Sequence, residues 1–517
     1  MSDSVYENYP PYLNPAQKEF LVQTVKDWAT QNGLMVRPAP TFISKDSNPY
    51  GVLATNAPVT LFPSPFPKSS FEEAKALQTV YNKLYAAITC NKEWIGKIME
   101  DLIDVDDFIS NLWKVHITVQ EEGYAQTLSL GLYRSDYMAH SPSGSTSPQL
   151  KQVEFNTISS SFGGLSSLVT SLHSELLNSP PGHPLAYPQH PLLTSGAVPE
   201  NTAVETLSAG LATAHTAYGP SKSNPKLPTC ILFVVQENER NIFDQLALSR
   251  QLTKVHKIPV FRLLSSEVLD HTSIPDSNPA RPLIYHPPYF PSGTEFEVTT
   301  VYLRCFYTPT DYNSPRDWQA RTHLERSASI KCPTVLNQLA GSKIIQQVLA
   351  TTTGPDHLTS FLPDTPEPLI SRLRATFAPQ YDLSLDGQGR ALALNPETAS
   401  NHVLKPQREG GGNNIYKTAI PDFLRSIPEN EWKRWILMEL IHPPAAAKNV
   451  ALRSDGEVLA GGVIGELGVY GTILWDQAGG EVLHNEQGGW LMRTKAEGVN
   501  EGGVATGFSS LDSIVLF

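Results

Sequence analysis

The sequence reads Lys405-Pro-Gln-Arg-Glu-Gly-Gly-Gly-Asn-Asn-Ile-Tyr416 where a short apolar strand ends and a glycine loop begins. Gly410, Gly411 and Gly412 tolerate positive φ and let backbone N–H groups come close to phosphate oxygens. Lys405 can add positive charge to the same phosphates, and Glu409 and Asn414 carry oxygen ligands suited to Mg²⁺. Taken alone, the stretch fits either a phosphate-binding loop or a flexible hairpin loop with incidental charge.

A second stretch, Val153 to Gly164, reads as a strand that runs into a glycine turn. Side chains alternate along a strand, so Glu154 and Asn156 point to the same face. Two oxygen ligands between apolar neighbours make half of a Mg²⁺ site, and Glu409 could supply a third ligand from far along the chain. Ser159 and Ser161 continue the same spacing into the turn. A solvated strand face is the alternative.

A third stretch, Leu491 to Lys495, precedes the glycine-rich run Glu501–Gly507. Arg493 and Lys495 alternate onto one face, and such a pair beside a glycine loop favours an anion-binding site. A surface strand and turn would produce the same pattern.

Several common sites are excluded by their missing motifs. There is no GxxxxGK[ST], and the glycines between 461 and 471 do not form GxGxxG ahead of a helix. GxSxG and HExxH are absent as well. A P-loop, a dinucleotide fingerprint, a serine-hydrolase elbow and a zinc-protease helix are therefore not expected.

Composition narrows the classes further. The 517 residues are 40% apolar and 17% charged, with a formal net charge of −12 and no Lys/Arg run. Nucleic acid needs a basic surface, so neither nucleic acid nor an anionic membrane is an expected partner. No stretch reaches the roughly 20 apolar residues of a membrane span, and no secretory signal is visible at the start, so a cytoplasmic location is expected.

Element signals support a mixed α/β chain. A helix is predicted over 14–32, with Asn14 as N-cap and Gly33 after its end, and a second from Ser70, with Glu73 completing a capping box. Residues 125–157 predict strand, turn and strand, whereas 179–228 lack periodicity over much of their length and predict a surface excursion or a connection between lobes.

From Thr229 the order strand, helix, strand predicts a βαβ unit with parallel strands. We expect five parts: 1–228, the first part of the core; 229–342, a small α/β substrate lobe; 343–395, a helical connection; 396–463, a lid region with the glycine loop; and 464–517, the C-terminal part of the core.

Further segments carry a family resemblance. They are Arg134-Ser-Asp-Tyr-Met138, Gln236-Glu-Asn-Glu-Arg-Asn-Ile-Phe-Asp-Gln245, Val301-Tyr-Leu-Arg304, Lys331-Cys-Pro333 with Gln338-Leu-Ala-Gly-Ser-Lys343, and Ile436-Leu-Met-Glu439. Together with the three stretches above, and in the same order from about residue 120 to 510, they resemble eukaryotic-type glutathione synthetase, an ATP-grasp ligase family.

The resemblance implies an ATP-grasp fold of the α/β and α+β classes, with a small parallel-sheet substrate-binding lobe and a glycine-rich lid. It implies ATP-dependent joining of γ-glutamylcysteine to glycine through an acyl phosphate, and a homodimer. Two alternatives stay open: a ligase with another amine, such as β-alanine or serine, and a non-catalytic ATP-binding regulator on the same fold.

The resemblance also implies roles for single residues. Those matching the family's Mg²⁺ ligands are Glu154, Asn156 and Glu409. Those matching nucleotide contacts are Lys343, Lys405, Gly410, Gly411, Gly412, Asn414, Tyr416, Met438, Glu439, Glu466 and Lys495. Those matching peptide-substrate positions are Arg134, Ser159, Ser161, Glu239, Asn241, Gln245, Arg304, Arg493, Val504 and Ala505. Arg134, Lys343, Lys405 and Arg493 are the expected catalytic cations, because an acyl-phosphate mechanism needs charge neutralisation and positioning in place of a nucleophilic side chain.

Overall fold

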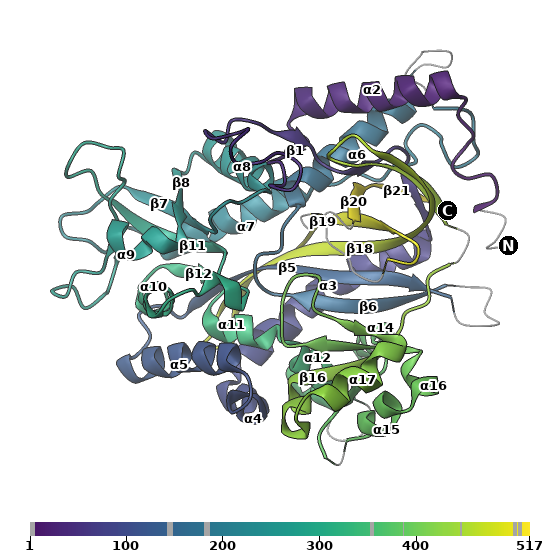
Figure 1. Cartoon of the computed structure of the whole chain (residues 1–517). Helices are drawn as coiled ribbons and strands as arrows, with labels where there is room; N and C mark the ends of the chain where they lie inside the picture. Colours follow the sequence, from purple (N-terminus) through teal and green to yellow (C-terminus); the bar gives the residue numbers. More distant parts are fainter. Residues whose placement is uncertain are drawn as a thin grey trace.

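A computed structural model of the chain describes residues 6–141, 148–179, 187–351, 356–385, 387–444, 447–499, 504 and 509–517. Within these residues, 13 strands form one large mixed sheet and four more form a small antiparallel sheet beside it (Figure 1). The chain is therefore of the mixed α/β class that the sequence predicts.

Antiparallel strands make up the middle of the large sheet. β5 (Leu128–His140) lies between β6 (Gln149–Asn156) and β18 (Val458–Asp476), and β19 (Val482–Ala496) follows β18. β20 (Ser509–Asp512), β3 (Val59–Thr60) and β17 (Lys448–Leu452) continue the sheet beyond β19. The predicted strand–turn–strand over 125–157 is confirmed by β5 and β6, whereas residues 142–147 of its tip lie outside the described residues.

Parallel strands extend the other side of the same sheet. β7 (Thr229–Val235) pairs in parallel with β8 (Val260–Leu264) and β11 (Phe296–Arg304), and β12 (Ile330–Cys332) joins β11 to β5, again in parallel. Helix α8 (Ile242–Gln251) connects β7 to β8. The predicted βαβ unit is confirmed, and its strands are continuous with the large sheet.

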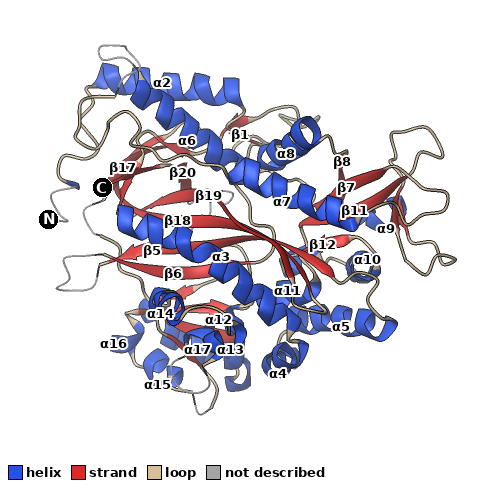
Figure 2. Ribbon diagram, turned by 180° about the vertical axis from the view of Figure 1, so that it is seen from behind, coloured by secondary structure: helices blue, strands red, loops and turns tan. Residues whose placement is uncertain are grey.

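Helices cover both faces of the large sheet, and the alternation of side chains decides what each helix meets. On one face, α3 (Lys68–Cys90) packs over Tyr133 and Tyr137 of β5 (Figure 2). On the other, α6 (Gly163–Asn178) and α7 (Ala203–Tyr218) pack over Leu130 and Leu132. Arg134 and Asp136 share the face of Leu132, just beyond the apolar part of that layer.

The small sheet contains β13 (Gln380–Asp382), β16 (Trp435–Glu439), β14 (His402–Pro406) and β15 (Ile415–Tyr416), in that order. It has an apolar core of its own with α15 (Gly389–Leu394), α16 (Pro396–Ala399) and α17 (Ile420–Ser426), built around Leu404 and Leu437. Figure 1 shows this unit in green below β6. α12 (Lys343–Ala350) contacts both β6 and the small sheet.

The remaining elements are shorter or lie at the periphery. The helices are α2 (Pro15–Asn32), α4 (Lys92–Ile103), α5 (Asp107–Glu122), α9 (Val268–His271), α10 (Pro315–Arg326), α11 (Val335–Ala340), α13 (His357–Phe361) and α14 (Glu367–Thr376). The strands are β1 (Met35–Val36), β2 (Thr55–Asn56), β4 (Ser64–Phe66), β9 (Thr272–Ser273), β10 (Leu283–Tyr285) and β21 (Ile514–Leu516). A π-helical turn spans Leu252–His256, and 3₁₀ turns span Ser265–Glu267, Pro309–Asp311, Lys417–Ala419 and Glu429–Arg434.

The two predicted N-terminal helices are present, with one correction. α2 begins after the N-cap Asn14, which forms a capping box with Gln17, and ends at Gly33 in the left-handed region. α3 begins at Lys68, two residues before the predicted start, and Ser70 is buried inside it. Glu73 bonds to Arg372, so a tertiary ion pair takes the side chain that the capping-box pattern had assigned to the helix terminus.

The prediction for 179–228 was wrong over its second half. Residues 203–218 form α7, whose Leu207 and Leu211 are buried against the large sheet. The helical periodicity of its small and apolar residues extends only over residues 203–218, and the Pro-rich sequence before this segment obscured the pattern.

In the described part of the chain, none of the helices combines the length and the apolar character that crossing a lipid bilayer requires.

Phe155 lies on the face of β6 opposite Glu154 and Asn156, so its substitution tests how the apolar core stabilises this strand. Its ring is buried on the α3 side of β6 and stacks on Tyr85, with centroids 3.9 Å apart. We expect Phe155→Ala to lower the free energy of unfolding by about 3–5 kcal/mol, because it leaves a cavity under β6. Urea unfolding followed by fluorescence measures this loss. Phe20→Ala, at a ring that is 45% exposed, is the control, and an equal loss in both variants would contradict the assignment.

Candidate active site

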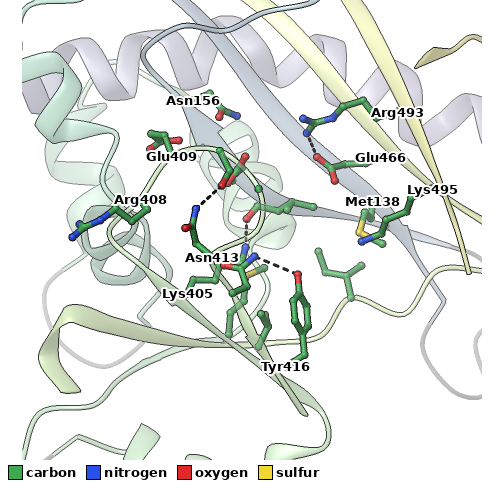
Figure 3. Close-up of a pocket in the computed structure, with 18 of the residues that line it drawn as sticks. Met138, Asn156, Lys405, Arg408, Glu409, Asn413, Tyr416, Glu466, Arg493 and Lys495 are labelled. Carbon is green, nitrogen blue, oxygen red and sulfur yellow. Dashed lines mark hydrogen bonds and ion pairs between the residues drawn. The ribbon is translucent and has the colours of Figure 1, made fainter. Parts of the chain in front are cut away.

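A cavity of about 980 Å³ opens between the polar face of the large sheet and the small sheet. Figure 3 shows Asn156, Glu409, Lys405, Glu466 and Arg493 around it, carried by strands and loops far apart in the sequence. The predicted residues that line the cavity are Arg134, Glu154, Asn156, Ser159, Ser161, Lys405, Glu409, Gly410, Gly411, Asn414, Tyr416, Met438, Glu439, Glu466, Arg493, Lys495 and Val504.

Lys343 joins two carboxylates at one end of this cavity. Its Nζ lies 3.2 Å from Oε2 of Glu154, on β6, and 3.3 Å from both carboxylate oxygens of Glu409, on the loop after β14. Lys343 is the first residue of α12 and its side chain is 5% exposed, compared with 24% for Glu154 and 19% for Glu409. The three side chains therefore tie the large sheet, the small sheet and α12 together at one point.

The electrostatics of this cluster separate the two carboxylates. Burial alone would raise the pKa of Glu154, but Lys343, Lys405 and other nearby cations outweigh it and hold the pKa at about 2. Burial and the charge of Glu154 raise the pKa of Glu409, although Lys343 opposes them. Burial would lower the pKa of Lys343, but the two carboxylates raise it above its ordinary value. Near neutral pH the cluster holds the ammonium group of Lys343 between the carboxylates of Glu154 and Glu409. A metal cation could bind the same two carboxylates.

A second cluster of charged side chains lies on the neighbouring strands β5, β18 and β19. Arg493, on β19, donates to Glu466 across the β18–β19 ladder and to Asp136 Oδ2 at 2.8 Å. Arg134, on β5, is 4% exposed and its Nη1 donates to the carbonyl oxygen of Ser161 at 3.3 Å. Two guanidinium groups with carboxylate partners thus border the cavity, and such groups can bind an incoming carboxylate or phosphate through paired N–H donors.

The glycine loop has the backbone that its sequence predicts. Gly410 and Gly412 have φ values of 83° and 94°, in the region that favours glycine. Lys405 Nζ donates to the carbonyl oxygen of Val153 at 2.9 Å, so its ammonium lies beside β6. At the start of the loop, Arg408 also lines the cavity, but its guanidinium group turns away from Glu409 (Figure 3). This group donates to Asp106 Oδ2 at 2.7 Å.

An apolar pocket lies on the side of the small sheet. Val403 and Met438 are buried there, with the rings and chains of Tyr416, Leu440 and Ile441 packed against them. Glu439 accepts a hydrogen bond from Tyr381 at 2.8 Å. Apolar walls of this kind, next to strand backbone, suit a flat heterocyclic ring.

The predicted peptide-substrate residues divide into two groups. Ser159, Ser161 and Arg134 line the cavity, and Val504 is buried at its edge. The residues that do not line it are Glu239, Asn241, Gln245 and Arg304. Gln245 donates to Glu239 at 2.7 Å, and Arg304 donates to Asp244 at 3.0 Å. Ala505 lies outside the described residues.

Asp244 connects this second group to the cavity. Its carboxylate accepts from the backbone nitrogens of Phe162 and Gly164 at 2.9 and 2.7 Å. Ser159 and Phe162 have φ values of 53° and 75°, which are rare for residues with side chains and mark a turn held by its surroundings. Asp244, with its partner Arg304, therefore holds the 159–164 turn from outside the cavity.

Two buried carboxylates at this site, Asp136 and Asp244, were not among the residues predicted from the sequence. Asp136 is two residues from Arg134 on a strand, so the alternation of side chains could have placed both on one face. Asp244 lies on helix α8, and nothing in its spacing points to the distant turn that it holds. No cluster of three His, Cys, Asp or Glu side chains suited to a metal occurs in the described ranges; the predicted ligand set contains two carboxylates and one carboxamide.

Comparisons with known proteins give one consistent result. Residues 15–516 match the family described as the ATP-binding domain of eukaryotic glutathione synthase. The chain is 36% identical to the glutathione synthetase large chain of Schizosaccharomyces pombe, over 97% of this chain and 98% of that one. It is also 36% identical to glutathione synthetase of Homo sapiens, over 96% of both chains.

A solved structure supports the fold. The apo form of a glutathione synthetase-like effector from Globodera pallida superposes with a TM-score of 0.73 at 20% identity, over 98% of both chains. At that identity the likeness concerns the fold alone. The match over nearly the whole sequence and the relatives above 30% identity show that this chain belongs to the eukaryotic glutathione synthase family.

Proposed function

We propose that this protein is a glutathione synthetase, an enzyme that joins γ-glutamylcysteine to glycine at the expense of ATP. The observation that carries the proposal is the cavity in which Glu154, Lys343 and Glu409 meet beside Arg134 and Arg493. Membership of the family adds the substrates, because relatives over nearly the whole chain carry the name glutathione synthetase.

The proposed reaction has two steps. A carboxylate oxygen of the cysteinyl residue attacks the γ-phosphorus of ATP, and the bond between that phosphorus and the ADP oxygen breaks. The amine nitrogen of glycine then attacks the carbonyl carbon of the acyl phosphate, loses a proton, and the carbon–oxygen bond to phosphate breaks. Both steps concentrate negative charge on phosphoryl oxygens, and fixed cations stabilise such charge.

The cations of the cavity have positions that suit these steps. We assign Lys343 and Lys405 to the nucleotide phosphates and the backbone N–H groups of Gly410, Gly411 and Gly412 to the same chain of oxygens. Arg134 and Arg493 are assigned to the dipeptide and to the charge that develops on its carboxylate. Ser159, Ser161, Glu239, Asn241, Gln245, Arg304, Val504 and Ala505 are also assigned to the dipeptide, and Arg304 in addition bonds to Asp244, which holds the 159–164 turn.

The residues present also fit a magnesium ion. Mg²⁺ is typically held by one or two carboxylates together with water and substrate phosphates, and Glu154, Glu409 and the carbonyl oxygen of Asn156 form such an oxygen-only set at the cavity wall. When bound, the ion would neutralise phosphate charge and orient the phosphoryl group. Glu154 and Glu409 would hold it, and Lys343 would be released from them toward the phosphates.

Four further assignments belong to this proposal. The adenine ring is assigned to the apolar pocket of Met438 and Tyr416, with Asn414, Glu439, Glu466 and Lys495 around the rest of the nucleotide. The fold is assigned to the ATP-grasp class, with residues 1–228, 343–395 and 464–517 as its core, 229–342 as a substrate lobe and 396–463 as a lid. A lid over the site would exclude water, which would otherwise hydrolyse the acyl phosphate. A homodimer and a cytoplasmic location are proposed from the family.

Phosphate release tests the function directly. We expect release from ATP to require Mg²⁺ and γ-glutamylcysteine and to be fastest with glycine, with the tripeptide identified by mass spectrometry. Faster reaction with β-alanine or serine would point to the alternative amine. ATP hydrolysis at the same rate with and without the dipeptide, or no hydrolysis at all, would overturn the proposal.

The carboxylates give a second prediction. We expect Glu154→Gln and Glu409→Gln each to lower kcat/KM by at least about 100-fold, and to raise the Mg²⁺ concentration needed for half-maximal rate, because each removes a charged ligand. Steady-state kinetics at varied Mg²⁺ measures both effects. Glu72→Gln, at a side chain that is 54% exposed on α3, is the control and should keep wild-type kinetics.

The raised pKa of Glu409 predicts a pH dependence. A proton and a cation compete for the same carboxylate, so Mg²⁺-dependent binding is present above this pKa and is lost as the pH falls through it. The loss should begin at a higher pH than for an ordinary glutamate, whereas Glu154, with a pKa of about 2, stays ionised. Calorimetric titration with a non-hydrolysable ATP analogue measures it. An acid limb of the same shape in Glu409→Gln would refute the assignment to Glu409.

A further inference from the structure

Asp136 is a buried carboxylate directly beneath the cavity. It lies on β5 and is 0% exposed, so its own atoms do not reach the cavity surface. Its neighbours on the same face of the strand, Arg134 and Met138, do line the cavity. Across the sheet it stands opposite Glu154 of β6 and Gly468 of β18. Asp136 is thus surrounded by groups assigned to ligands without being able to contact a ligand itself.

This carboxylate binds three of those groups at once. Its Oδ1 accepts from Arg134 Nε at 2.6 Å and its Oδ2 from Arg134 Nη2 at 2.8 Å. The same Oδ2 accepts from Arg493 Nη2 at 2.8 Å and from Asn156 Nδ2 at 3.0 Å. One side chain therefore fixes two guanidinium groups and one carboxamide, which come from three different strands.

The contact with Asn156 decides which end of its carboxamide faces a cation. An ionised carboxylate only accepts hydrogen bonds, so the nitrogen of Asn156 must turn toward Asp136. That nitrogen also donates to the carbonyl oxygen of Arg134 at 3.2 Å. With the nitrogen held on this side, the carbonyl oxygen is the end left for a metal ion. A cation needs that oxygen, and the reversed amide would present N–H donors to it.

The contact of Asp136 with Arg134 and Arg493 fixes the position of both side chains and allows their guanidinium groups to lie close together. Arg134 and Arg493 share Oδ2 of Asp136, so their guanidinium groups lie close together in a buried place. Two such cations repel each other unless a negative charge lies between them. Glu466 compensates Arg493 on its other side. For Arg134, Asp136 is the carboxylate in contact among the described side chains.

Gly468, on the neighbouring strand β18, leaves space for the ion pair between Arg134 and Asp136. A Cβ atom on Gly468 would lie 2.7 Å from Cδ of Arg134 and 2.9 Å from Oδ1 of Asp136. Both distances are shorter than van der Waals contact, so any side chain at 468 would push the pair aside. This gives a structural reason for one of the glycines between 461 and 471, which form no nucleotide fingerprint.

We propose that Asp136 is a positioning residue for ligand binding: it orients the Asn156 oxygen toward the metal ion and holds Arg134 and Arg493 in place for the dipeptide. The inference rests on the proposed function, since it uses the ligands assigned there. It differs from a purely structural role, in which Asp136 would stabilise the sheet and leave ligand affinities unchanged.

Asp136→Asn tests the inference, because the amide keeps the size of the side chain and removes its charge. One end of the new amide is a donor, so it faces the donors of Asn156 or of the arginines. By calorimetry we expect the affinity for γ-glutamylcysteine to fall about tenfold or more, and the Mg²⁺ concentration that supports binding of a non-hydrolysable ATP analogue to rise about 10–100-fold, as for other partners of metal ligands.

Glu297→Gln is the matched control. Glu297 is another buried carboxylate of the same sheet, on β11, and accepts from Tyr218 at 2.6 Å, far along the strand from Arg304. We expect this variant to lower the melting temperature and to keep both ligand affinities. If Asp136→Asn behaves in the same way, with lower stability and unchanged affinities, the inference is wrong.

A double variant separates the two roles. In D136N/N156D a carboxylate stands at 156, and it presents an oxygen to the cation whichever way it turns. We expect the Mg²⁺ requirement to return toward the wild-type value while dipeptide affinity stays low, because the arginines still lack their shared anion. Equal recovery of both affinities, or of neither, would contradict the assignment of two roles to Asp136.

Gly468→Ala gives the same test without removing any charge, and decides the question if Asp136→Asn does not fold. It should weaken dipeptide binding by displacing Arg134 and Asp136. Its control is Gly461→Ala on the same strand, where a Cβ atom would meet no atom within 4 Å. Equal dipeptide affinity in the two variants would overturn the inference. Failure of the proposed function is distinct, because the wild-type protein would then show no dipeptide-dependent phosphate release.

Discussion

A single ammonium group between two carboxylates joins the large sheet to the small four-stranded sheet. Glu154 belongs to the large sheet and Glu409 to the loop that follows β14 of the small sheet, and Lys343 lies within 3.3 Å of both. Two partly buried carboxylates repel each other and are costly to bury without a positive partner. The cation therefore favours the approach of the loop to β6 at one end of the cavity. In the proposed complex, Mg²⁺ and phosphates replace contacts that the protein otherwise makes with itself.

The other cations of the cavity are likewise paired with groups of the protein itself. Arg493 is paired with Glu466 and Asp136, Arg134 with Asp136, and Lys405 with a backbone carbonyl of β6. A protein with a formal net charge of −12 can thus keep a dense group of cations in one place, because each is compensated locally. An anionic ligand competes with these carboxylates for the cations, which agrees with the proposed binding of ATP together with Mg²⁺.

Strand alternation separates stability from ligand binding on the same segments. On β6, Phe155 packs into the aromatic core under α3, whereas Glu154 and Asn156 face the cavity. On β5, Tyr133 and Tyr137 face α3, and Arg134 and Asp136 take the opposite side. A slip of one residue in either strand would exchange the two sets. The long register of β5 with β18, from Tyr137 opposite Leu467 to Leu128 opposite Asp476, prevents such a slip and keeps the arginines under the cavity.

The sequence determined local features and the faces of single strands. The capping residues of α2, the parallel βαβ unit around α8, the positive φ of Gly410 and Gly412, and the common face of Glu154 and Asn156 depend on neighbours within a few residues, and could be predicted for that reason. Family resemblance added Lys343, which spacing alone could not connect to Glu154 and Glu409. The tertiary structure decided the rest. That Asp244 holds the 159–164 turn, that α7 is buried and that Asp136 joins three strands all follow from strand order and register. Local sequence does not encode these features, because contacts between distant segments depend on how the whole chain packs.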